Sequence, residues 1–364
     1  MKTMTLQEAV SAVRPLDAEA TRKARERQDQ LTKPAGSLGR LEALSVQLAG
    51  ITGDSIPHIR HKVIVTMAGD HGVVAEGVSA YPQEVTPQMV LNFLRGGAAI
   101  NVLARHVGAR VVVVDMGVAA DLPPSPDLVV RKVAHGASNI ARGPAMTPEQ
   151  AVRAIEAGIA TVEGEIDKGL DIVGTGDMGI GNTTPSAAIA VALTGHTAAE
   201  IVGRGTGVDD EGLGRKVAAV ERAIAINHPN CHDALDVLAK VGGFEIGGLA
   251  GVIIGAAAHR RPVVVDGFIS GAAAMIATGL APQVQPYLIA AHRSQERGHR
   301  LMLKWMRLRP LLDLDLRLGE GTGAALSIFL AEAACKVLAE MATFQEAGVS
   351  ERSETPDQVR EPSR

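Results

Sequence analysis

Apolar residues follow two different spacings along this chain of 364 residues. Over residues 1–60 they recur three and four positions apart among charged residues, which predicts an N-terminal segment of amphipathic helices. From residue 61 to 291, short runs that are apolar at nearly every position alternate with helical patterns. Such runs are typical of strands buried on both faces of a parallel sheet. We therefore predict an α/β core domain at 61–291, with a doubly wound, mainly parallel sheet flanked by helices, of the Rossmann-like type.

The same patterns give the boundaries of the elements. The N-terminal helices are predicted at 6–13, 18–28 and 37–50. The predicted strands are 63–67, 111–114, 172–173 and 263–265, and the predicted helices among them are 98–106, 148–167, 185–193 and 245–259. In the C-terminal segment, 292–349, we expect a helix through Trp305, an extended stretch at 311–318 and a long helix at about 322–341. Residues 350–364 are polar and contain proline, so we expect a disordered tail there.

Composition argues against several classes of protein. The formal net charge of −4 gives no basic footprint for nucleic acid, and five Phe, two Tyr and one Trp leave few rings for stacking. The runs at 178–199 and 267–291 are apolar, but polar residues, proline or repeated glycine interrupt them, which favours buried helices and loops over membrane spans. Cys231 and Cys335 lie far apart and suggest no disulfide framework. We expect a cytoplasmic protein, with neither nucleic acid nor a membrane as a partner.

Carboxylates stand at or just beyond the ends of the predicted strands. They are Asp70, Asp115, Asp177 and Asp266. In open parallel sheets, ligands bind in the crevice beyond the carboxyl ends of the strands. A row of acids there predicts a binding site, although each of them alone could cap the helix that follows.

Three glycine-rich loops could bind a ligand or allow close packing. The loop at 174–184 follows a strand and opens a helix, which is the setting of an anion site. Its G-x-G-x-x-G spacing is a weak dinucleotide signal, because no acid follows the next apolar run. The loop at 203–211, with Lys216 downstream, suits a phosphate or an ordinary Asp-capped helix. The glycines of 241–251 recur along a helix and favour its close approach to the sheet.

The fourth glycine-rich loop is 317–323, in which Glu320 stands between glycines. A carboxylate in a partly apolar setting gains proton affinity, which suits a general base. The same position suits an N-cap of the helix that follows, and the local sequence supports both interpretations equally.

Two further candidates have simpler explanations. The 228–232 stretch has metal-type residues, but no second cluster completes a site, so we interpret it as a surface turn. Asp70 and His71 could form a dyad, although neighbours in a strand-end loop more often shape a pocket.

Seven motifs occur in one order along the chain. They are Lys33-Pro-Ala-Gly-Ser-Leu-Gly39, Ala68-Gly-Asp-His-Gly72, Glu76-Gly-Val-Ser-Ala-Tyr-Pro82, Glu84-Val-Thr-Pro-Gln88, Gly179-Ile-Gly-Asn-Thr-Thr184, Gly203-Arg-Gly-Thr-Gly207 and Arg317-Leu-Gly-Glu-Gly-Thr-Gly323. From about residue 5 to 348 the chain resembles the nicotinate-nucleotide–dimethylbenzimidazole phosphoribosyltransferases of cobalamin biosynthesis. The resemblance implies transfer of 5-phosphoribose from nicotinate mononucleotide to 5,6-dimethylbenzimidazole, giving α-ribazole 5′-phosphate and nicotinate. It also implies a homodimer, and a small helical domain built from both termini.

The resemblance also implies roles for individual residues. Glu320 would be the catalytic base, and Asp177 would stand where the family often has a glutamate, so that its part as an auxiliary acid is open. The benzimidazole pocket would be bordered by Ser79, Tyr81, Gln88 and Leu318. The phosphoribose would be held by Gly176, Gly203, Gly205, Gly207, Lys216, Arg317 and Gly323. The leaving group is already a pyridinium, so neither a metal nor a cofactor is expected.

The sequence is also compatible with three alternatives. The first is a transferase of the same fold that acts on another azole or on a phenol. The second is a dinucleotide-dependent oxidoreductase, disfavoured by the missing ribose-binding acid. The third is a nucleotide-binding module without catalytic activity, which would bind nucleotide but release no nicotinate.

Overall fold

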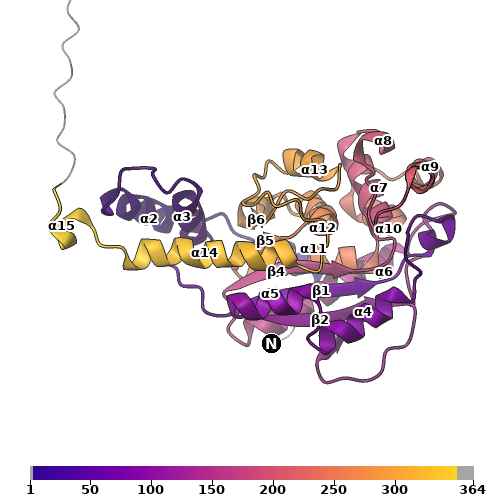
Figure 1. Cartoon of the computed structure of the whole chain (residues 1–364), viewed down its shortest axis with the longest axis horizontal. Coiled ribbons are helices and arrows are strands. Elements are labelled where there is room, and N and C mark those ends of the chain that lie inside the picture. The colour runs from indigo at the N-terminus through magenta and orange to yellow at the C-terminus, as the bar shows by residue number, and fades with distance from the viewer. Residues whose placement is uncertain (1–2, 351–364) are drawn as a thin grey trace, which may run out of the picture.

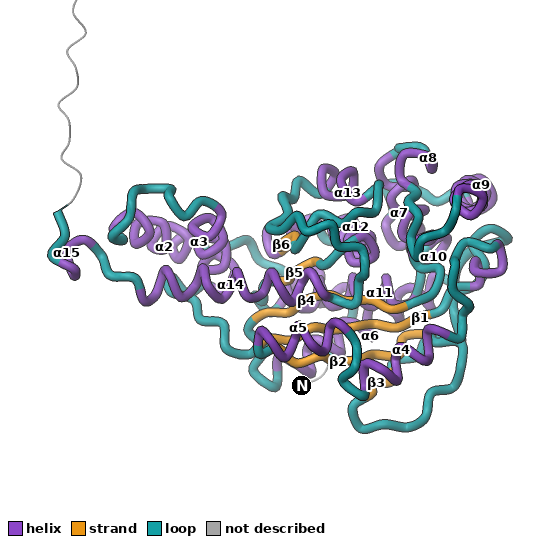
Figure 2. Tube along the Cα trace, viewed as in Figure 1, coloured by secondary structure: helices purple, strands orange, loops and turns teal. Residues whose placement is uncertain are grey.

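A computed structural model describes residues 3–350 of the chain. Its centre is one six-stranded, all-parallel sheet with the order β3-β2-β1-β4-β5-β6 (Figure 2). The strands are β1 (Lys62–Gly69), β2 (Ala109–Gly117), β3 (Leu128–Val130), β4 (Ile172–Met178), β5 (Val263–Val265) and β6 (Leu288–Ala290). The order reverses between β1 and β4, as in the doubly wound nucleotide-binding folds. The predicted fold class is confirmed.

Helices cover both faces of this sheet, so its central strands lie in two cores. Side chains of β1 alternate: Val63, Val65 and Met67 point to one face, and Ile64 and Ala68 to the other. On the first face α11 (Phe244–Ala258) and α12 (Phe268–Leu280) contact the strands. The core on this face also includes residues of α1 (Leu6–Ala12), α6 (Pro148–Ile166), α7 (Thr183–Thr194), α9 (Asp210–Asn227), α10 (Ala234–Val241) and α13 (His299–Trp305). The core on the second face includes residues of α4 (Val85–Leu94), α5 (Ala99–Val107) and α14 (Thr322–Glu340), which contact the strands, and of α3 (Arg40–Thr52), which lies beside the sheet (Figure 1). The remaining elements are α2 (Ala18–Gln30), α8 (Ala198–Ile201), α15 (Phe344–Ala347) and the 3₁₀ turns η1 (Gly72–Glu76) and η2 (Pro282–Tyr287).

Glycines of α11 allow the close packing that the sequence predicts. A Cβ on Gly248 would lie 2.4 Å from the sulfur of Met67, on β1. Glycines also let α11 and α6 touch backbone to backbone, since a Cβ on Gly158 would lie 1.9 Å from the carbonyl oxygen of Gly248. The prediction of close approach to the sheet is confirmed, and it extends to the neighbouring helix.

The two ends of the chain meet away from the sheet. α2, α3 and the last turns of α14 form a group of helices beside the α/β body (Figure 1), with Ala24, Ala49 and Leu338 buried among them. Strand-like pairing of Leu31 with Thr343 adds a backbone link between the two ends. By contrast, α1 packs on α6 and α11 of the body. The division of the chain into domains stays a prediction.

One described helix, α14, is long and apolar enough to cross a membrane by length and composition alone. It packs along α3, α5 and β4, as a core helix does.

Some predicted elements have different limits. The helix expected from 292 begins only at His299, because the backbone of 293–295 instead pairs with the 311–318 stretch: Arg293 N donates to Leu312 O and Gln295 N to Leu316 O. That stretch is therefore extended but lies outside the sheet. Of the predicted tail, 351–364 lies outside the described residues.

Candidate active site

A cavity of about 660 Å³ opens beyond the carboxyl ends of β4 and β5, next to the point where the strand order reverses. This volume is in the usual range for small-ligand sites. Six of the predicted site residues line it: Tyr81, Asp177, Gly205, Arg317, Leu318 and Glu320. The cavity therefore brings together loops that are up to about 240 positions apart in the sequence, in the place that a doubly wound sheet provides for a ligand.

Glu320 is buried at the wall of this cavity, with 5% of its surface exposed. Its Oε2 accepts a hydrogen bond from Ile100 N (3.2 Å), in the first turn of α5. Burial, the largest effect, raises the pKa of this carboxyl above its ordinary value, while the hydrogen bond from Ile100 lowers it. A raised pKa improves a carboxylate as a general base.

The alternative role of Glu320 as N-cap of α14 is wrong. The N-cap is Gly321, and no side chain at that position caps the helix. Glu320 itself has a left-handed backbone, with φ of 62°, between Gly319 (80°) and Gly321 (96°). A non-glycine residue in this region costs about 1–3 kcal/mol and persists only where its surroundings hold it.

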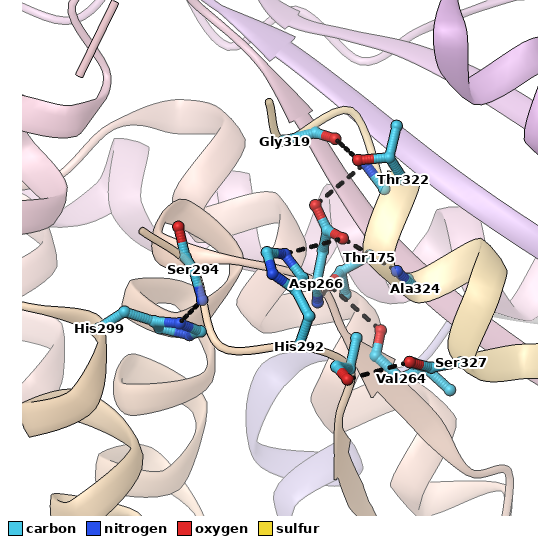
Figure 3. A network of polar contacts seen from close by, with 12 residues as sticks. Thr175, Val264, Asp266, His292, Ser294, His299, Gly319, Thr322, Ala324 and Ser327 are labelled. Carbon is cyan, nitrogen blue, oxygen red and sulfur yellow. Dashed lines mark hydrogen bonds and ion pairs between the residues drawn. The ribbon is translucent and has the colours of Figure 1, made fainter. Parts of the chain in front are cut away.

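Asp266, at the end of β5, supplies the capping carboxylate that α14 lacks. Its Oδ1 accepts from Ala324 N (2.9 Å; Figure 3). Its Oδ2 accepts from Gly321 N (3.2 Å). The side chain is fully buried, and burial raises its pKa to about 7 although the backbone hydrogen bonds lower it. The sequence pointed to Asp266 only as one strand-end acid among four, without a role.

Asp177 lines the cavity from the end of β4, next to the turn that carries Glu320: a Cβ on Gly319 would lie 3.1 Å from Asp177 Oδ1. Its Oδ2 accepts from Asn182 Nδ2 (2.9 Å), and its Oδ1 is buried without a hydrogen-bond partner. Burial, and next the charge of Asp266, raise the pKa of Asp177 well above its ordinary value. The protonated carboxyl is therefore favoured, and it could donate a hydrogen bond into the cavity.

The loop at 203–211, predicted to bind phosphate, is fixed by hydrogen bonds to Gly205. Gly205 N donates to Glu296 Oε1 (2.9 Å), and Gly205 O accepts from an Arg317 guanidinium nitrogen (3.0 Å). Lys216 is buried behind the loop and donates from Nζ to Thr183 Oγ1 (2.8 Å). Burial lowers the pKa of Lys216 to about 8. Glu296, which the sequence gave no reason to select, also lines the cavity.

Four predicted phosphoribose glycines do not line the cavity. Gly176, Gly203 and Gly323 have no room for a side chain, because a Cβ would lie 2.2 Å from Glu320 O, 2.1 Å from Glu296 Oε2 and 2.1 Å from His292 Cδ2, respectively. Gly207 has φ of 100° and open space around it. The first three allow the loops to approach one another closely behind the site.

The predicted benzimidazole residues divide in the same way. Tyr81 and Leu318 line the cavity, and both are more than half exposed. Ser79 and Gln88 do not line it; Ser79 lies 3.4 Å from Thr206 Oγ1, and Gln88 is exposed on α4. Apolar wall residues that sequence reasoning missed are Val85, Met89, Met178, Ile180, Phe268 and Ile269. The four-residue spacing of Val85 and Met89 places both on one face of α4, and this spacing was the sequence signal for that part of the wall.

The other candidates lie elsewhere. Asp70 and Asp115 accept from backbone N–H groups of Ala119 and Val118, so they fix the loop after β2. His71 forms a buried pair with Glu245 (2.8 Å) outside the cavity wall. The 228–232 stretch is an exposed turn, as predicted. Over residues 3–350, no group of three or more His, Cys, Asp or Glu is placed to hold a metal ion.

Comparison with known proteins identifies the family. A family model described as phosphoribosyltransferase matches residues 13–349. The nicotinate-nucleotide–dimethylbenzimidazole phosphoribosyltransferase of Roseiflexus sp. (strain RS-1) is 63% identical over 349 residues, which cover 96% of this chain and 99% of the relative. The enzyme of the same name from Chloroflexus aggregans (strain MD-66 / DSM 9485) is 61% identical with the same coverage.

Solved structures agree. A crystal structure of a nicotinate-nucleotide–dimethylbenzimidazole phosphoribosyltransferase from Thermus thermophilus has a TM-score of 0.88 and 50% identity, and the match covers 93% of this chain and 100% of that one. The chain belongs to the nicotinate-nucleotide–dimethylbenzimidazole phosphoribosyltransferase family.

Proposed function

We propose that this protein transfers 5-phosphoribose from nicotinate mononucleotide to 5,6-dimethylbenzimidazole, giving α-ribazole 5′-phosphate and nicotinate, in cobalamin biosynthesis. The observation that carries the proposal is the Glu320 carboxylate: it is buried at the wall of the cavity, its pKa is raised, and one oxygen is fixed by Ile100 N. The names of the relatives support the same activity.

In the proposed mechanism, Glu320 removes the proton from one ring nitrogen of the benzimidazole. The other ring nitrogen attacks the anomeric carbon, and the bond from that carbon to the pyridinium nitrogen breaks with inversion. The electron pair of the broken bond returns to the nitrogen of nicotinate, so no covalent enzyme intermediate is required. Proton removal by a positioned base is typically worth about 10²–10⁴ in rate.

The cavity offers two differently built sides for the two substrates. Tyr81, Met89 and Leu318 give an apolar side suited to the benzimidazole. Thr183, Gly205 and Thr206 give a polar side, with Lys216 behind it, suited to the ribose phosphate. Asp177 lies near the Glu320 turn, and we assign it the role of a hydrogen-bond donor to the ribose or the leaving group.

We further propose that the protein works as a cytoplasmic homodimer. In this proposal residues 1–60 are the N-terminal helical segment of a small domain, residues 61–291 are the α/β core domain, and residues 292–349 are a C-terminal segment with the catalytic loop and helices. The meeting of α2, α3 and the end of α14 supports such a division.

The direct test is to incubate the purified protein with nicotinate mononucleotide and 5,6-dimethylbenzimidazole and to measure both products by chromatography. We expect nicotinate and α-ribazole 5′-phosphate in equal amounts. Nucleotide binding without nicotinate release, measured by calorimetry, would instead indicate a binding module. Parallel reactions with benzimidazole, adenine and a phenol would show whether another acceptor is preferred.

A further inference from the structure

The turn at 319–323, which carries Glu320, is held by one contact within it and by groups from β1 and from the end of β5. Glu320 O accepts from Thr66 Oγ1 (3.0 Å), on β1, and Gly319 O accepts from Thr322 Oγ1 (2.9 Å). Asp266 binds the N–H groups on both sides of Thr322–Gly323, those of Gly321 and Ala324. The left-handed backbone of Glu320 therefore depends on contacts from β1 and from the end of β5.

Asp266 takes no direct part in the wall of the cavity. It is fully buried and is not among the cavity-lining residues, so it acts on a bound substrate through its neighbours: the turn, and His292, which lines the cavity. Its own position is fixed, since Asp266 N donates to Thr175 Oγ1 (3.2 Å), on β4 (Figure 3).

His292 completes the surroundings of Asp266. It is buried, with Nε2 3.8 Å from Asp266 Oδ1 and Nδ1 without a hydrogen-bond partner, and it packs so closely on Gly323 that no side chain would fit there. Burial lowers the pKa of His292, so the neutral ring is favoured. Asp266 thus lacks a buried cation beside it, and its negative charge is balanced by the backbone N–H groups of the turn.

We propose that Asp266 is a positioning residue for Glu320: by binding Gly321 N and Ala324 N together, it holds the 319–323 turn in the conformation that places the Glu320 carboxylate in the cavity. The inference rests on the proposed function, in which Glu320 is the base. A purely structural cap would stabilise α14 without setting the rate of the reaction.

The test is the Asp266→Asn variant, which has the same shape but sets an amide N–H₂ against one of the two backbone N–H groups. We expect kcat to fall on the order of 10- to 100-fold, because small displacements of a catalytic group have effects of this size. The KM values of both substrates should stay within about twofold, because the binding surfaces are unchanged. A kcat equal to that of the wild type would overturn the proposal.

A pH profile adds a second readout, in which Glu320 and Asp177 are the titratable groups whose charges act on Asp266 or respond to it. Burial raises the pKa of Asp266 to about 7 in the wild type, so its protonation at lower pH should loosen the turn. The ratio of wild-type to Asp266→Asn kcat should therefore shrink as the pH falls below about 7. A ratio that is the same at every pH would contradict the positioning role.

Matched variants separate positioning from stability. Asp233→Asn weakens a cap of the same kind, since Asp233 accepts from Leu235 N and Asp236 N at the start of α10, and it should leave kcat unchanged. If Asp266→Asn does not fold, Asp266→Glu decides, because it keeps the carboxylate but moves it by one methylene relative to Gly321 N and Ala324 N. A lower kcat at unchanged KM then supports the proposal, and an unchanged kcat contradicts it.

Failure of the positioning proposal can be distinguished from failure of the proposed function. If the wild type releases no nicotinate, the proposed function fails, and amide hydrogen exchange at Gly321 and Ala324 still tests the contact. Faster exchange at both amides in Asp266→Asn, or in Asp266→Glu where the first variant does not fold, shows that Asp266 holds the turn. Unchanged exchange contradicts it.

Discussion

At the scale of the residue, the Glu320 carboxylate is available for catalysis because it does not cap the helix that follows it. Asp266 takes that part, so one of the Glu320 oxygens is bound by Ile100 N and the group stays available to the cavity. Its raised pKa arises from burial, which is a property of the folded chain. The same carboxylate in an unfolded chain would be an ordinary acid.

Replacement of Glu320 by Gln tests this role with little change of shape. We expect kcat to fall by about 10²–10⁴, because the azole proton loses its acceptor. In the wild type, kcat should fall as the pH drops through the raised pKa of Glu320, since only the ionised form is a base. Glu340→Gln, at the far end of α14, is the control. Steady-state rates across the pH range decide, and a Glu320→Gln enzyme as fast as the wild type would remove Glu320 from the mechanism.

Asp177 links the chemistry of the site to the stability of the protein. The pKa of Asp177 is raised in the folded protein, so the folded protein holds this proton more tightly than the unfolded chain does. The resulting contribution to the free energy of unfolding is fully present below the pKa of Asp177 in the unfolded chain. It is lost as the pH rises through the pKa in the folded protein. Asp177→Asn keeps an oxygen for Asn182 Nδ2 and carries no charge at any pH. We expect this variant to be more stable than the wild type in alkaline buffer, with a difference that shrinks in acid. Urea unfolding at several pH values measures it, and a variant that is no more stable at alkaline pH would contradict the assigned cause.

At the scale of the element, the contact between α6 and α11 depends on glycine. Gly158→Ala would place a methyl group 1.9 Å from Gly248 O, so the two helices would have to move apart. We expect a loss of about 1–3 kcal/mol in the free energy of unfolding, as for overpacked cores. Gly164→Ala, in the same helix, meets no atom within 4 Å and should be neutral or stabilise by up to about 1 kcal/mol. Equal effects of the two substitutions in urea denaturation would show that the contact is unimportant.

Elements with strong local patterns could be predicted from the sequence, and those without could not. β1 is buried at every position. Its continuous apolar run predicts a strand with helices packed on both of its faces. β3 and β6 have only three residues each and lie within loops or apolar stretches, so no period distinguishes them. Which carboxylate caps α14 depends on β5 ending beside the turn, a contact between residues more than 50 positions apart, and local sequence contains no trace of it.

The residues of the site could likewise be predicted only in part from the sequence. Sequence resemblance selects the right loops, but the fold decides which of their residues face the cavity. Gly176 and Gly323 belong to such loops and yet serve close packing, whereas Glu296 and Met89 line the wall without a sequence signal strong enough to select them.

At the scale of the whole molecule, α14 joins the catalytic turn to the helices of the chain ends. Its 19 residues span roughly 28 Å, from the turn of Glu320 to α2. Arg27, on α2, donates to the carbonyl oxygens of Leu338 (2.6 Å), Ala339 (3.2 Å) and Met341 (3.4 Å), which are left free where α14 ends. A guanidinium here satisfies the last carbonyls and lies at the negative end of the helix dipole.

Loss of this contact should separate stability from catalysis. Arg27→Ala should lower the free energy of unfolding by about 1–3 kcal/mol, because hydrogen bonds from a charged group are removed. Its kcat at low temperature should match that of the wild type, since the Glu320 turn is fixed locally by Thr66, Asp266 and Thr322. Arg25→Ala, exposed on the same helix, is the control and should change neither. Thermal unfolding and steady-state rates on the same samples test the separation. A fall in kcat for Arg27→Ala under conditions where the protein is fully folded would show instead that α14 transmits the position of the chain ends to the catalytic turn.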